Sequence, residues 1–465
     1  MRFLLCLFTL GVLPVWAADA VSTLVTMHLD KAGAEIPADF LGLSYEKTAM
    51  AEKHFRLDNT ELLNFHRNLG RAVIRVSGNK VELSSWQREE TNAKPERGAT
   101  VVTPGCLDQF YAFAKAVDAK VIHGVNLAGG KPEMSADEIA YALKVGGNSI
   151  LAVEVGNEPD HYDKDTKELR AKGYSYALYK KELEDAQKVI FARNPKVPLA
   201  GPATTSGDAA WFEPSMADFK SKWVLVTSHF YPLSAQSTPP PTVESLLSEA
   251  TKLKAVNMLE KHVAIARKAG IPYRLAETNS ASMRGTDGVS DSFVAAVWGA
   301  DFLFDVAEHG VTGVNLHTIF GTRGYTVISY DRTNYAPRPL YYALLLFKDA
   351  GRGKLLRTET KSTANVTSHA TIADDNRVRV TIINKGVSEA TKVSIVTDGK
   401  RTRGTVARLI AASPTEKTAI TYSGATVKLD GKWTAETPEA IKGTAGRFEV
   451  TLPACSAAVL TLEAN

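Results

Sequence analysis

Short apolar runs alternate with longer stretches of helical periodicity from about residue 39 to residue 350. The runs are rich in Val, Ile and Leu and several end in polar residues, a pattern typical of buried parallel strands. Between them apolar residues recur at three and four positions, which predicts amphipathic helices. Eight strands are expected, at 39–46, 72–78, 120–127, 150–158, 198–203, 223–232, 273–280 and 313–321.

The expected helices include 107–119, 176–192, 246–270 and 290–310. Eight strand–helix units in this length of chain predict an α/β fold, a (β/α)8 or TIM barrel, over residues 37–350. In such barrels the active site lies at the C-terminal ends of the strands. Polar residues at the ends of apolar strands are therefore candidates for function.

The pattern changes after Gly351 to alternating apolar and polar positions without helical stretches. Alternation separated by Gly, Asn-Lys-Gly and Asp-Gly turns predicts an antiparallel β-sandwich accessory domain over residues 351–465. Residues 22–30 alternate in the same way, so the segment 19–36 is expected to join the sandwich before the barrel begins.

The N-terminus has an early positive charge at Arg2, an apolar run through Trp16 and small residues at Ala17, Ala18 and Ala20. This order predicts a signal peptide over residues 1–18, and hence a secreted or periplasmic protein. No later segment reaches the roughly 18 apolar residues of a membrane helix, so no membrane span is expected.

Composition narrows the classes of partner. The 465 residues carry 55 basic and 51 acidic side chains, a net charge of +4, and no basic block with interleaved aromatic residues, so nucleic acid is not an expected partner. Once Cys6 leaves with the signal peptide, only Cys106 and Cys455 remain. Two buried thiols are favoured, with a single bridge still open. No Cys or His cluster has ligand spacing, and no metal or cofactor is expected.

Two glutamates stand at the ends of predicted strands. Glu158 follows Asn157 at the end of strand four, and Glu277 lies in "RLAETNS" at the end of strand seven. Retaining glycoside hydrolysis requires such a pair, one as acid/base and one as nucleophile, with carboxyl groups about 5–5.5 Å apart. Pro159 lacks an amide hydrogen and is expected to end the strand directly after Glu158. The amide of Asn157 is a candidate ligand for the sugar 2-hydroxyl.

Further polar residues end or follow predicted strands. Glu46, Asn79 and Asn126 belong to strands one to three and are candidate ligands of sugar hydroxyls, with a capping or turn role as the alternative for Asn79. His229 and His317 lie at or just inside strand ends, where each could line a pocket or be a hydrogen-bonded core histidine.

Several motifs together carry a family resemblance. "EVGNEPD", "LAETNS", "GVSDSFVAAVWGADFLF", "SHFYP" and "FGTRGY" resemble family 79 of the glycoside hydrolases, the bacterial β-glucuronidases and heparanase-like enzymes, over nearly the whole mature chain. The resemblance implies that Glu158 is the acid/base, Glu277 the nucleophile and Asn157 the ligand of the 2-hydroxyl. It further implies that Tyr231 hydrogen-bonds near the nucleophile, with packing as its alternative role, and that Tyr325 holds the uronate carboxylate.

The leading hypothesis is a secreted retaining β-glucuronidase that acts on a glucuronic-acid-containing glycan without metal or cofactor. A uronate carboxylate needs several donors when it leaves water. Tyr325 offers a hydroxyl and Gly324 leaves the backbone open, while Arg323 is as well explained by solvent exposure. Two alternatives remain: an endo-acting hydrolase of a uronate-containing polysaccharide, and a carbohydrate-binding barrel that has lost catalysis.

Overall fold

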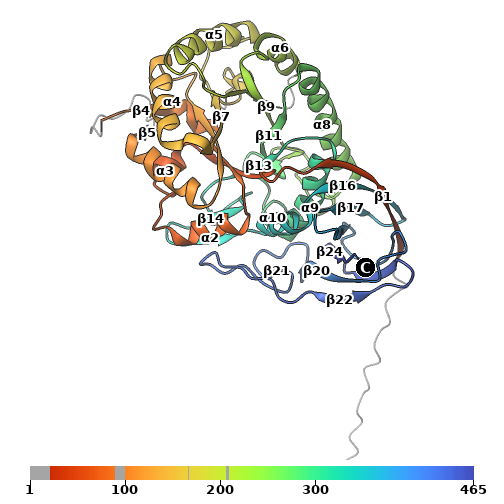
Figure 1. Cartoon of the computed structure of the whole chain (residues 1–465). Helices are drawn as coiled ribbons and strands as arrows, with labels where there is room; N and C mark the ends of the chain where they lie inside the picture. Colours follow the sequence, from red (N-terminus) through yellow and green to blue (C-terminus); the bar gives the residue numbers. More distant parts are fainter. Residues whose placement is uncertain (1–20, 90–99, 166, 206–208, 465) are drawn as a thin grey trace, which may run out of the picture.

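The computed structural model describes residues 21–89, 100–165, 167–205 and 209–464. The predicted signal peptide, residues 1–18, lies outside these ranges. A strand-and-helix barrel carries most of the chain, and a large sheet built from the C-terminal residues packs beside it (Figure 1).

Eight parallel strands close into a barrel, which confirms the predicted fold class. Their order around the barrel is β11-β13-β2-β3-β6-β7-β8-β9, and each coincides with one predicted apolar run. The strands are β2 (Leu41–Glu46), β3 (Val73–Ser77), β6 (Lys120–Val125), β7 (Ile150–Val155), β8 (Leu199–Thr205), β9 (Trp223–Phe230), β11 (Tyr273–Thr278) and β13 (Val314–Thr318).

Helices surround the barrel strands (Figure 1). They are α1 (Thr48–Ala51), α2 (Thr60–Asn68), α3 (Pro104–Ala116), α4 (Pro132–Gly146), α5 (Tyr176–Arg193), α6 (Ala209–Phe219), α7 (Val243–Leu246), α8 (Glu249–Ala269), α9 (Phe293–Glu308) and α10 (Pro339–Ala350). The expected helix 246–270 corresponds to α8, which begins three residues later than predicted, and the short helix α7 precedes it. Thr242 forms a capping box before α7, and the Ser248 side chain accepts the backbone N–H of Thr251 to begin α8.

Shorter elements lie in the connections. They are the 3-10 helices η1 (Asn79–Leu83), η3 (Gly147–Ser149) and η4 (Pro159–His161), and the strands β4 (Ser84–Trp86), β5 (Thr100–Val102), β10 (Leu233–Ser234), β12 (Ala281–Ser282), β14 (Ile328–Tyr330) and β15 (Tyr335–Pro337).

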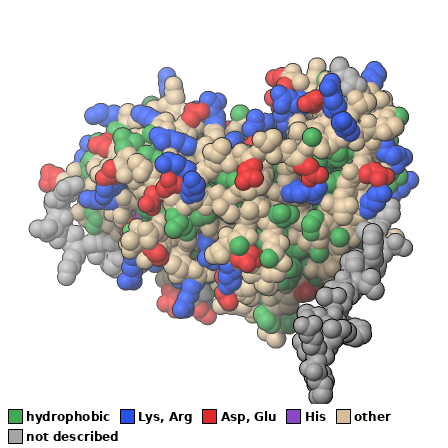
Figure 2. Space-filling view, turned by 90° about the horizontal axis from the view of Figure 1, so that it is seen from below, with side chains coloured by type: hydrophobic (Ala, Val, Ile, Leu, Met, Phe, Trp, Pro, Cys, Tyr) green, Lys and Arg blue, Asp and Glu red, His purple; other side chains and the backbone are tan. Residues whose placement is uncertain are grey.

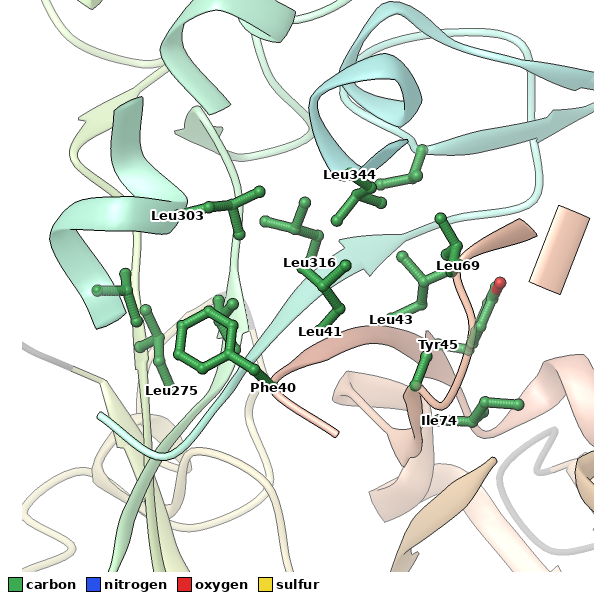
Figure 3. Close-up of a cluster of buried hydrophobic side chains, with 14 of the residues drawn as sticks. Phe40, Leu41, Leu43, Tyr45, Leu69, Ile74, Leu275, Leu303, Leu316 and Leu344 are labelled. Atoms are coloured by element: carbon green, nitrogen blue, oxygen red, sulfur yellow. The ribbon is translucent and has the colours of Figure 1, made fainter. Parts of the chain in front are cut away.

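The outer faces of the barrel strands build the main core. In Figure 3, Leu41 of β2 and Leu316 of β13 lie beside Leu303 of α9 and Leu344 of α10, and all four belong to one buried cluster. Each fully buried leucine contributes about 1.5–3 kcal/mol. This apolar layer holds the strands in register from outside and leaves the barrel interior available for other side chains.

The barrel interior changes character along the strands. Near the strand starts it is apolar, with a small cluster that includes Val73 of β3 and Ala152 of β7. Two residues further along the same strands, on the same face, stand Arg75 and Glu154, both without solvent exposure. The interior is therefore charged toward the C-terminal ends of the strands.

The C-terminal residues form a ten-stranded sheet that includes the first strand of the described chain. Its main path is β21-β20-β24-β18-β17-β16-β1-β19-β23, and β22 pairs with β20. The strands are β1 (Val21–Glu35), β16 (Lys354–Ser362), β17 (Val366–Ile372), β18 (Val378–Asn384), β19 (Thr391–Val396), β20 (Arg403–Ala411), β21 (Ile420–Tyr422), β22 (Glu439–Lys442), β23 (Arg447–Leu452) and β24 (Ser456–Leu462).

Strands from both halves of this sheet share one buried cluster, which includes Val393 of β19 and Leu460 of β24. The sheet is thus folded over a common core, as in the predicted sandwich. Its pairing is antiparallel except between β1 and β19, which are parallel. β1 also pairs antiparallel with β16, so it lies inside the sheet rather than at an edge.

A buried ionic cluster joins α9 to the sheet. Asp301 of α9 accepts hydrogen bonds from His369 of β17 at 2.9 Å and from Lys385 at 2.8 Å. His369 also bonds Glu308 at 2.7 Å, while Lys252 of α8 pairs with Asp305 at 2.9 Å. Burial would lower the pKa of His369, but Glu308 and Asp301 raise it to about 10. We call these six residues the junction cluster.

The surface mixes both signs of charge. Figure 2 shows basic and acidic side chains interspersed over one face. Among the described residues, no helix is both long and apolar enough to cross a bilayer. Cys106 and Cys455 are buried free thiols, as favoured from the sequence.

Candidate active site

Glu158 stands on a sharp elbow after β7. The strand ends at Val155, so the predicted end at residue 158 is wrong by three positions. The chain then turns through positive φ at Gly156 (+88°) and at Glu158 itself (+50°). Pro159, expected to end the strand, instead begins η4. A positive φ is costly for a glutamate and persists only where surrounding contacts hold it, and the Glu158 side chain is held by His229 and Lys167.

Glu277 lies within β11 and is 6% exposed. The hydroxyl of Tyr231 donates to its Oε1 at 2.8 Å, and the guanidinium of Arg75 donates to its Oε2 at 2.8 Å. Burial would raise the pKa of Glu277. Interactions with His317, His229 and Arg75 outweigh burial and lower the pKa to about 2, so the carboxylate is ionised.

Arg75 is the central cation of the site and was missed in the sequence. It has no solvent exposure and donates to Glu154 at 2.7 Å, to Asn157 Oδ1 at 2.9 Å and to Ser44 at 3.0 Å, in addition to Glu277. A charged residue inside the apolar run "AVIRVSG" was the available signal, together with the acidic residue inside "ILAVEVG". Opposite charges on interior faces of one barrel must pair.

The Nη2 atom of Arg75, which bonds Asn157, also bonds His229 Nε2 at 3.1 Å. Arginine only donates, so Nε2 must accept and the proton of the neutral ring lies on Nδ1. That nitrogen stands 3.0 Å from Glu158 Oε1 and therefore donates to it. His229 is 1% exposed and both of its ring nitrogens are bonded, so of the two roles left open it matches the hydrogen-bonded buried histidine, here in contact with the candidate acid/base.

The two glutamates are close together. One oxygen of Glu158, one oxygen of Glu277 and a ring nitrogen of His229 all lie within 4.8 Å of one another. Lys167, in the connection after η4, pairs with the other oxygen of Glu158 at 3.0 Å. Burial would raise the pKa of Glu158, but Lys167 and His229 outweigh it and hold the pKa well below its usual range.

Asn157 is buried and its side chain spans the site. Its Oδ1 accepts from Arg75, and its Nδ2 approaches Asn79 Oδ1 at 3.3 Å. The Asn157 backbone N–H donates to Glu82 Oε1 at 2.8 Å. Asn79 is exposed at the start of η1 and lies beside Asn157, so the structure brings both candidates together.

Tyr231, Tyr325 and Glu46 border the same space. The hydroxyls of the two tyrosines lie 3.4 Å apart, which places Tyr325 beside the group that bonds Glu277. His317 stands 3.7 Å from both Glu277 and Glu46, and it bonds Ser44. Burial would lower the pKa of His317, but Glu277 and Glu46 raise it.

Two predicted ligands have structural explanations. Gly324 has φ of +72°, and a Cβ there would collide with the backbone oxygen of Arg284, so the turn alone requires glycine. The Asn126 amide donates to the backbone oxygens of Glu82 and Ser84 and accepts from Gly129. Because these bonds occupy the Asn126 amide in holding a loop, the prediction that Asn126 is a ligand of sugar hydroxyls is not kept. Arg323 is exposed.

Glu82 of η1 is a second residue missed in the sequence. Its buried carboxylate accepts from the backbone N–H groups of Leu127, Ala128 and Asn157 at 2.8–3.0 Å and from the Tyr162 hydroxyl. It thus joins the loops after β3, β6 and β7. Glu82 lies four residues past the β3 run, and nothing in its local sequence separates it from a surface glutamate.

Within the described part of the chain, two groups of side chains have ligand atoms close enough together for a metal ion: Glu158, His229 and Glu277 in the site, and Asp301, Asp305 and His369 in the junction cluster. In both, protein cations already neutralise the carboxylates. A separate cavity of about 850 Å³ has Phe320, Tyr330 and Tyr335 among its lining residues, and includes neither candidate glutamate.

Comparison with known proteins places this geometry in context. No protein-family profile matches the chain. It is 25% identical to a β-glucuronidase of Aspergillus niger, over 88% of this chain and 87% of that protein. It is also 25% identical to heparanase of Rattus norvegicus, over 59% of this chain and 50% of that protein. A solved 4-O-α-L-rhamnosyl-β-D-glucuronidase of Fusarium oxysporum shares the fold, with a TM-score of 0.81, 18% identity, and coverage of 95% of this chain and 100% of that one.

Proposed function

We propose that this chain, a glycoside hydrolase related to the family 79 β-glucuronidases and heparanase, is a retaining β-glucuronidase that releases terminal β-D-glucuronic acid. One observation carries the proposal: oxygens of Glu158 and Glu277 lie within 4.8 Å of each other. Retaining enzymes hold their carboxyl groups about 5–5.5 Å apart, whereas inverting enzymes leave about 6.5–9.5 Å for a water.

In the first step, the ionised Glu277 attacks the anomeric carbon and the glycosidic C–O bond breaks. Glu158 delivers a proton to the leaving oxygen, and a glycosyl ester forms on Glu277. Arg75 and Tyr231 fix the two oxygens of Glu277. Their hydrogen bonds keep the nucleophile ionised and oriented before substrate arrives.

In the second step, a water attacks the anomeric carbon, the ester bond breaks and Glu158 takes the proton of the water. Asn157 adjoins both glutamates, because Arg75 bonds its Oδ1 and Glu158 follows it in the chain. Its Nδ2 group is proposed to bond the sugar 2-hydroxyl, whose hydrogen bond strengthens in the transition state. Glu46 and Asn79 are proposed to bond further hydroxyls at the rim.

The proposed uronate selectivity rests on Tyr325 and its neighbours. A C6 carboxylate that enters a buried site needs donors. The hydroxyl of Tyr325 lies next to that of Tyr231, and His317 contributes a nearby group whose pKa is raised. The backbone N–H of Gly324 is proposed to bond the uronate carboxylate. The turn by itself already requires a glycine at this position.

Low exposure of both carboxylates favours release of a terminal sugar. The side chains of Glu158 and Glu277 are 12% and 8% exposed, as expected for a pocket rather than an open groove. An endo-acting hydrolase is the alternative. Release of glucuronic acid monomer from a defined oligosaccharide would indicate exo action, and release of internal fragments would indicate endo action.

We further propose export after cleavage near residue 18, a catalytic domain over residues 37–350 and an accessory sandwich formed by residues 19–36 and 351–465.

The test is mechanism-based labelling. A 2-fluoro glucuronide should label Glu277, and Glu277→Gln should abolish turnover of an aryl β-glucuronide. Glu158→Ala should lose far more activity on substrates with poor leaving groups than on activated ones, with partial rescue by azide. Glu133→Gln, an exposed change in α4, is the matched control. Inverted product or labelling at another residue would refute the retaining mechanism, and glucuronide binding without turnover would favour the carbohydrate-binding alternative.

A further inference from the structure

A buried lysine is paired with the carboxylate that the proposed function uses as an acid, and the inference below rests on that function. Lys167 is 8% exposed in its side chain. Its ammonium lies 3.0 Å from Glu158 Oε2, 3.0 Å from the backbone oxygen of Asn157 and 5.9 Å from the ring centre of Tyr162. The lysine is therefore held on the acid/base elbow by three different groups.

Both oxygens of Glu158 accept hydrogen bonds in this arrangement. Oε1 accepts from the Nδ1–H of His229, as the Arg75 contact to the other ring nitrogen requires, and Oε2 accepts from Lys167. A protonated carboxyl group would place its O–H against one of these two donors. These two donors thus hold Glu158 as an anion, the form that accepts a proton in the second step and not the form that donates one in the first.

Catalysis therefore requires the lysine to leave Oε2 when substrate binds. His229 is fixed from behind by Arg75. Lys167 comes from a connecting loop, and besides Oε2 it contacts backbone oxygens and an aromatic ring. The acid/base stands next to the leaving oxygen, so a cation 3.0 Å from it borders the leaving group rather than the glucuronic acid.

We propose that Lys167 is a specificity-determining residue: an anionic group on the leaving-group side of the scissile bond takes over the Lys167 ammonium and frees Glu158 Oε2 to carry the catalytic proton. Glu158 takes up this proton from solvent as the ammonium departs, and passes it to the leaving oxygen when the glycosidic bond breaks. The substrate class is a β-glucuronide whose leaving group carries a carboxylate or a sulfo group, as in an acidic glycan.

Other charged groups also face Glu158, and the test must separate them from Lys167. They come from four elements and are His161 and Asp160 of η4, His229 of β9, Glu277 of β11 and, through His229, Arg75 of β3. All of them remain in a variant that changes only Lys167, so a shifted pH profile in that variant reports the lysine.

The experiment compares Lys167→Met with the wild type on three aryl glucuronides: 3-carboxyphenyl, 3-sulfophenyl and the neutral 3-carbamoylphenyl. The wild type should favour the two anions over the amide by about 10-fold or more in kcat/KM, the scale of one hydrogen bond to a charged group. In Lys167→Met the ratio should fall toward 1. The carboxylate and sulfo arms show which anion the lysine prefers.

The pH profile gives a second readout that a purely structural role would not move. Loss of the ammonium raises the pKa of Glu158 in the free enzyme. The alkaline limb of kcat/KM for the neutral glucuronide should therefore move to higher pH in Lys167→Met. Lys167→Arg should keep the wild-type preference for anionic leaving groups and the wild-type alkaline limb of kcat/KM. Lys164→Met, an exposed change on the same loop, is the matched control.

Failure of this inference is distinguishable from failure of the proposed function. An activated 2,4-dinitrophenyl glucuronide needs no acid, so the wild type must turn it over if the proposed function holds. Given that turnover, an unchanged anion preference and an unchanged alkaline limb in Lys167→Met overturn the role of Lys167. If Lys167→Met does not fold, Lys167→Gln is assayed in its place, and loss of the wild-type preference in Lys167→Arg also overturns the proposal.

Discussion

His369 should stabilise the junction between the barrel and the sheet in a pH-dependent way. In the junction cluster, Asp301, Asp305 and Glu308 face Lys252, Lys385 and His369. Burial and Asp301 raise the pKa of Asp305 to about 6, so above about pH 7 all three carboxylates are ionised and the charges balance only while His369 is protonated. The change His369→Gln keeps a polar side chain of similar size but removes that charge and one of the two ring hydrogen bonds.

The magnitude follows from the raised pKa. The folded value is about 10 against 6.5 for an unperturbed histidine, and each pKa unit is worth about 1.4 kcal/mol. Because the folded pKa is raised, the contribution is fully present below the unfolded pKa and is lost as pH rises through the folded pKa. His369 should thus contribute about 4–5 kcal/mol at pH 6, about 2–3 kcal/mol at pH 8 and nearly nothing above pH 10.

Urea unfolding of the wild type and His369→Gln at pH 6, 8 and 10 measures this dependence. The difference in unfolding free energy between the two proteins should shrink steadily as pH rises. His309→Gln, a partly exposed change at the end of α9, is the control. An equal loss of stability at all three pH values would show that His369 acts by packing against Phe304 rather than through its charge.

Three further outcomes test the active site. Tyr325→Phe should reduce kcat/KM for an aryl glucuronide by about 1.5–3 kcal/mol and leave the corresponding glucoside nearly unaffected, and proportional loss of both would refute carboxylate recognition. Arg75→Met should raise the pKa of Glu277 and move the acidic limb of kcat/KM for a dinitrophenyl glucuronide to higher pH, and an unmoved limb would contradict the role of Arg75. Glu82→Gln should cost about 1–3 kcal/mol of stability in urea and slow poor leaving groups more than activated ones, while equal slowing would show that Glu82 does not position the acid elbow.

The barrel could be predicted because its strands are buried on both faces and read as continuous apolar runs. The start of α8 was placed three residues early because Leu246 and Leu247 precede it as an apolar pair, although the capping residue Ser248 was visible in the sequence. The elbow at Glu158 was placed on the strand because the sequence does not reveal a positive φ at a glutamate.

The glutamates were predictable as candidates because each ends an apolar run, while their partners were not. Arg75 meets Glu154 and Glu277 across 79 and 202 residues of chain, so only closure of the barrel brings them together. Lys167 comes from a connecting loop whose apolar residues show no helical or strand periodicity. The positive charges that set the pKa values of the carboxylates thus depend on tertiary structure, whereas the carboxylates themselves follow from strand pattern.

The place of β1 within the sheet determines the order in which the chain can fold during synthesis. β1 pairs with Lys354–Ser362 on one side and Thr391–Val396 on the other. It leaves the ribosome first but must wait for more than 300 further residues, the whole barrel included, before either partner exists. Closing so long a loop is slow. A fragment that starts at residue 351 would lack an interior strand and expose two unpaired edges, so the accessory unit cannot be excised as one continuous piece.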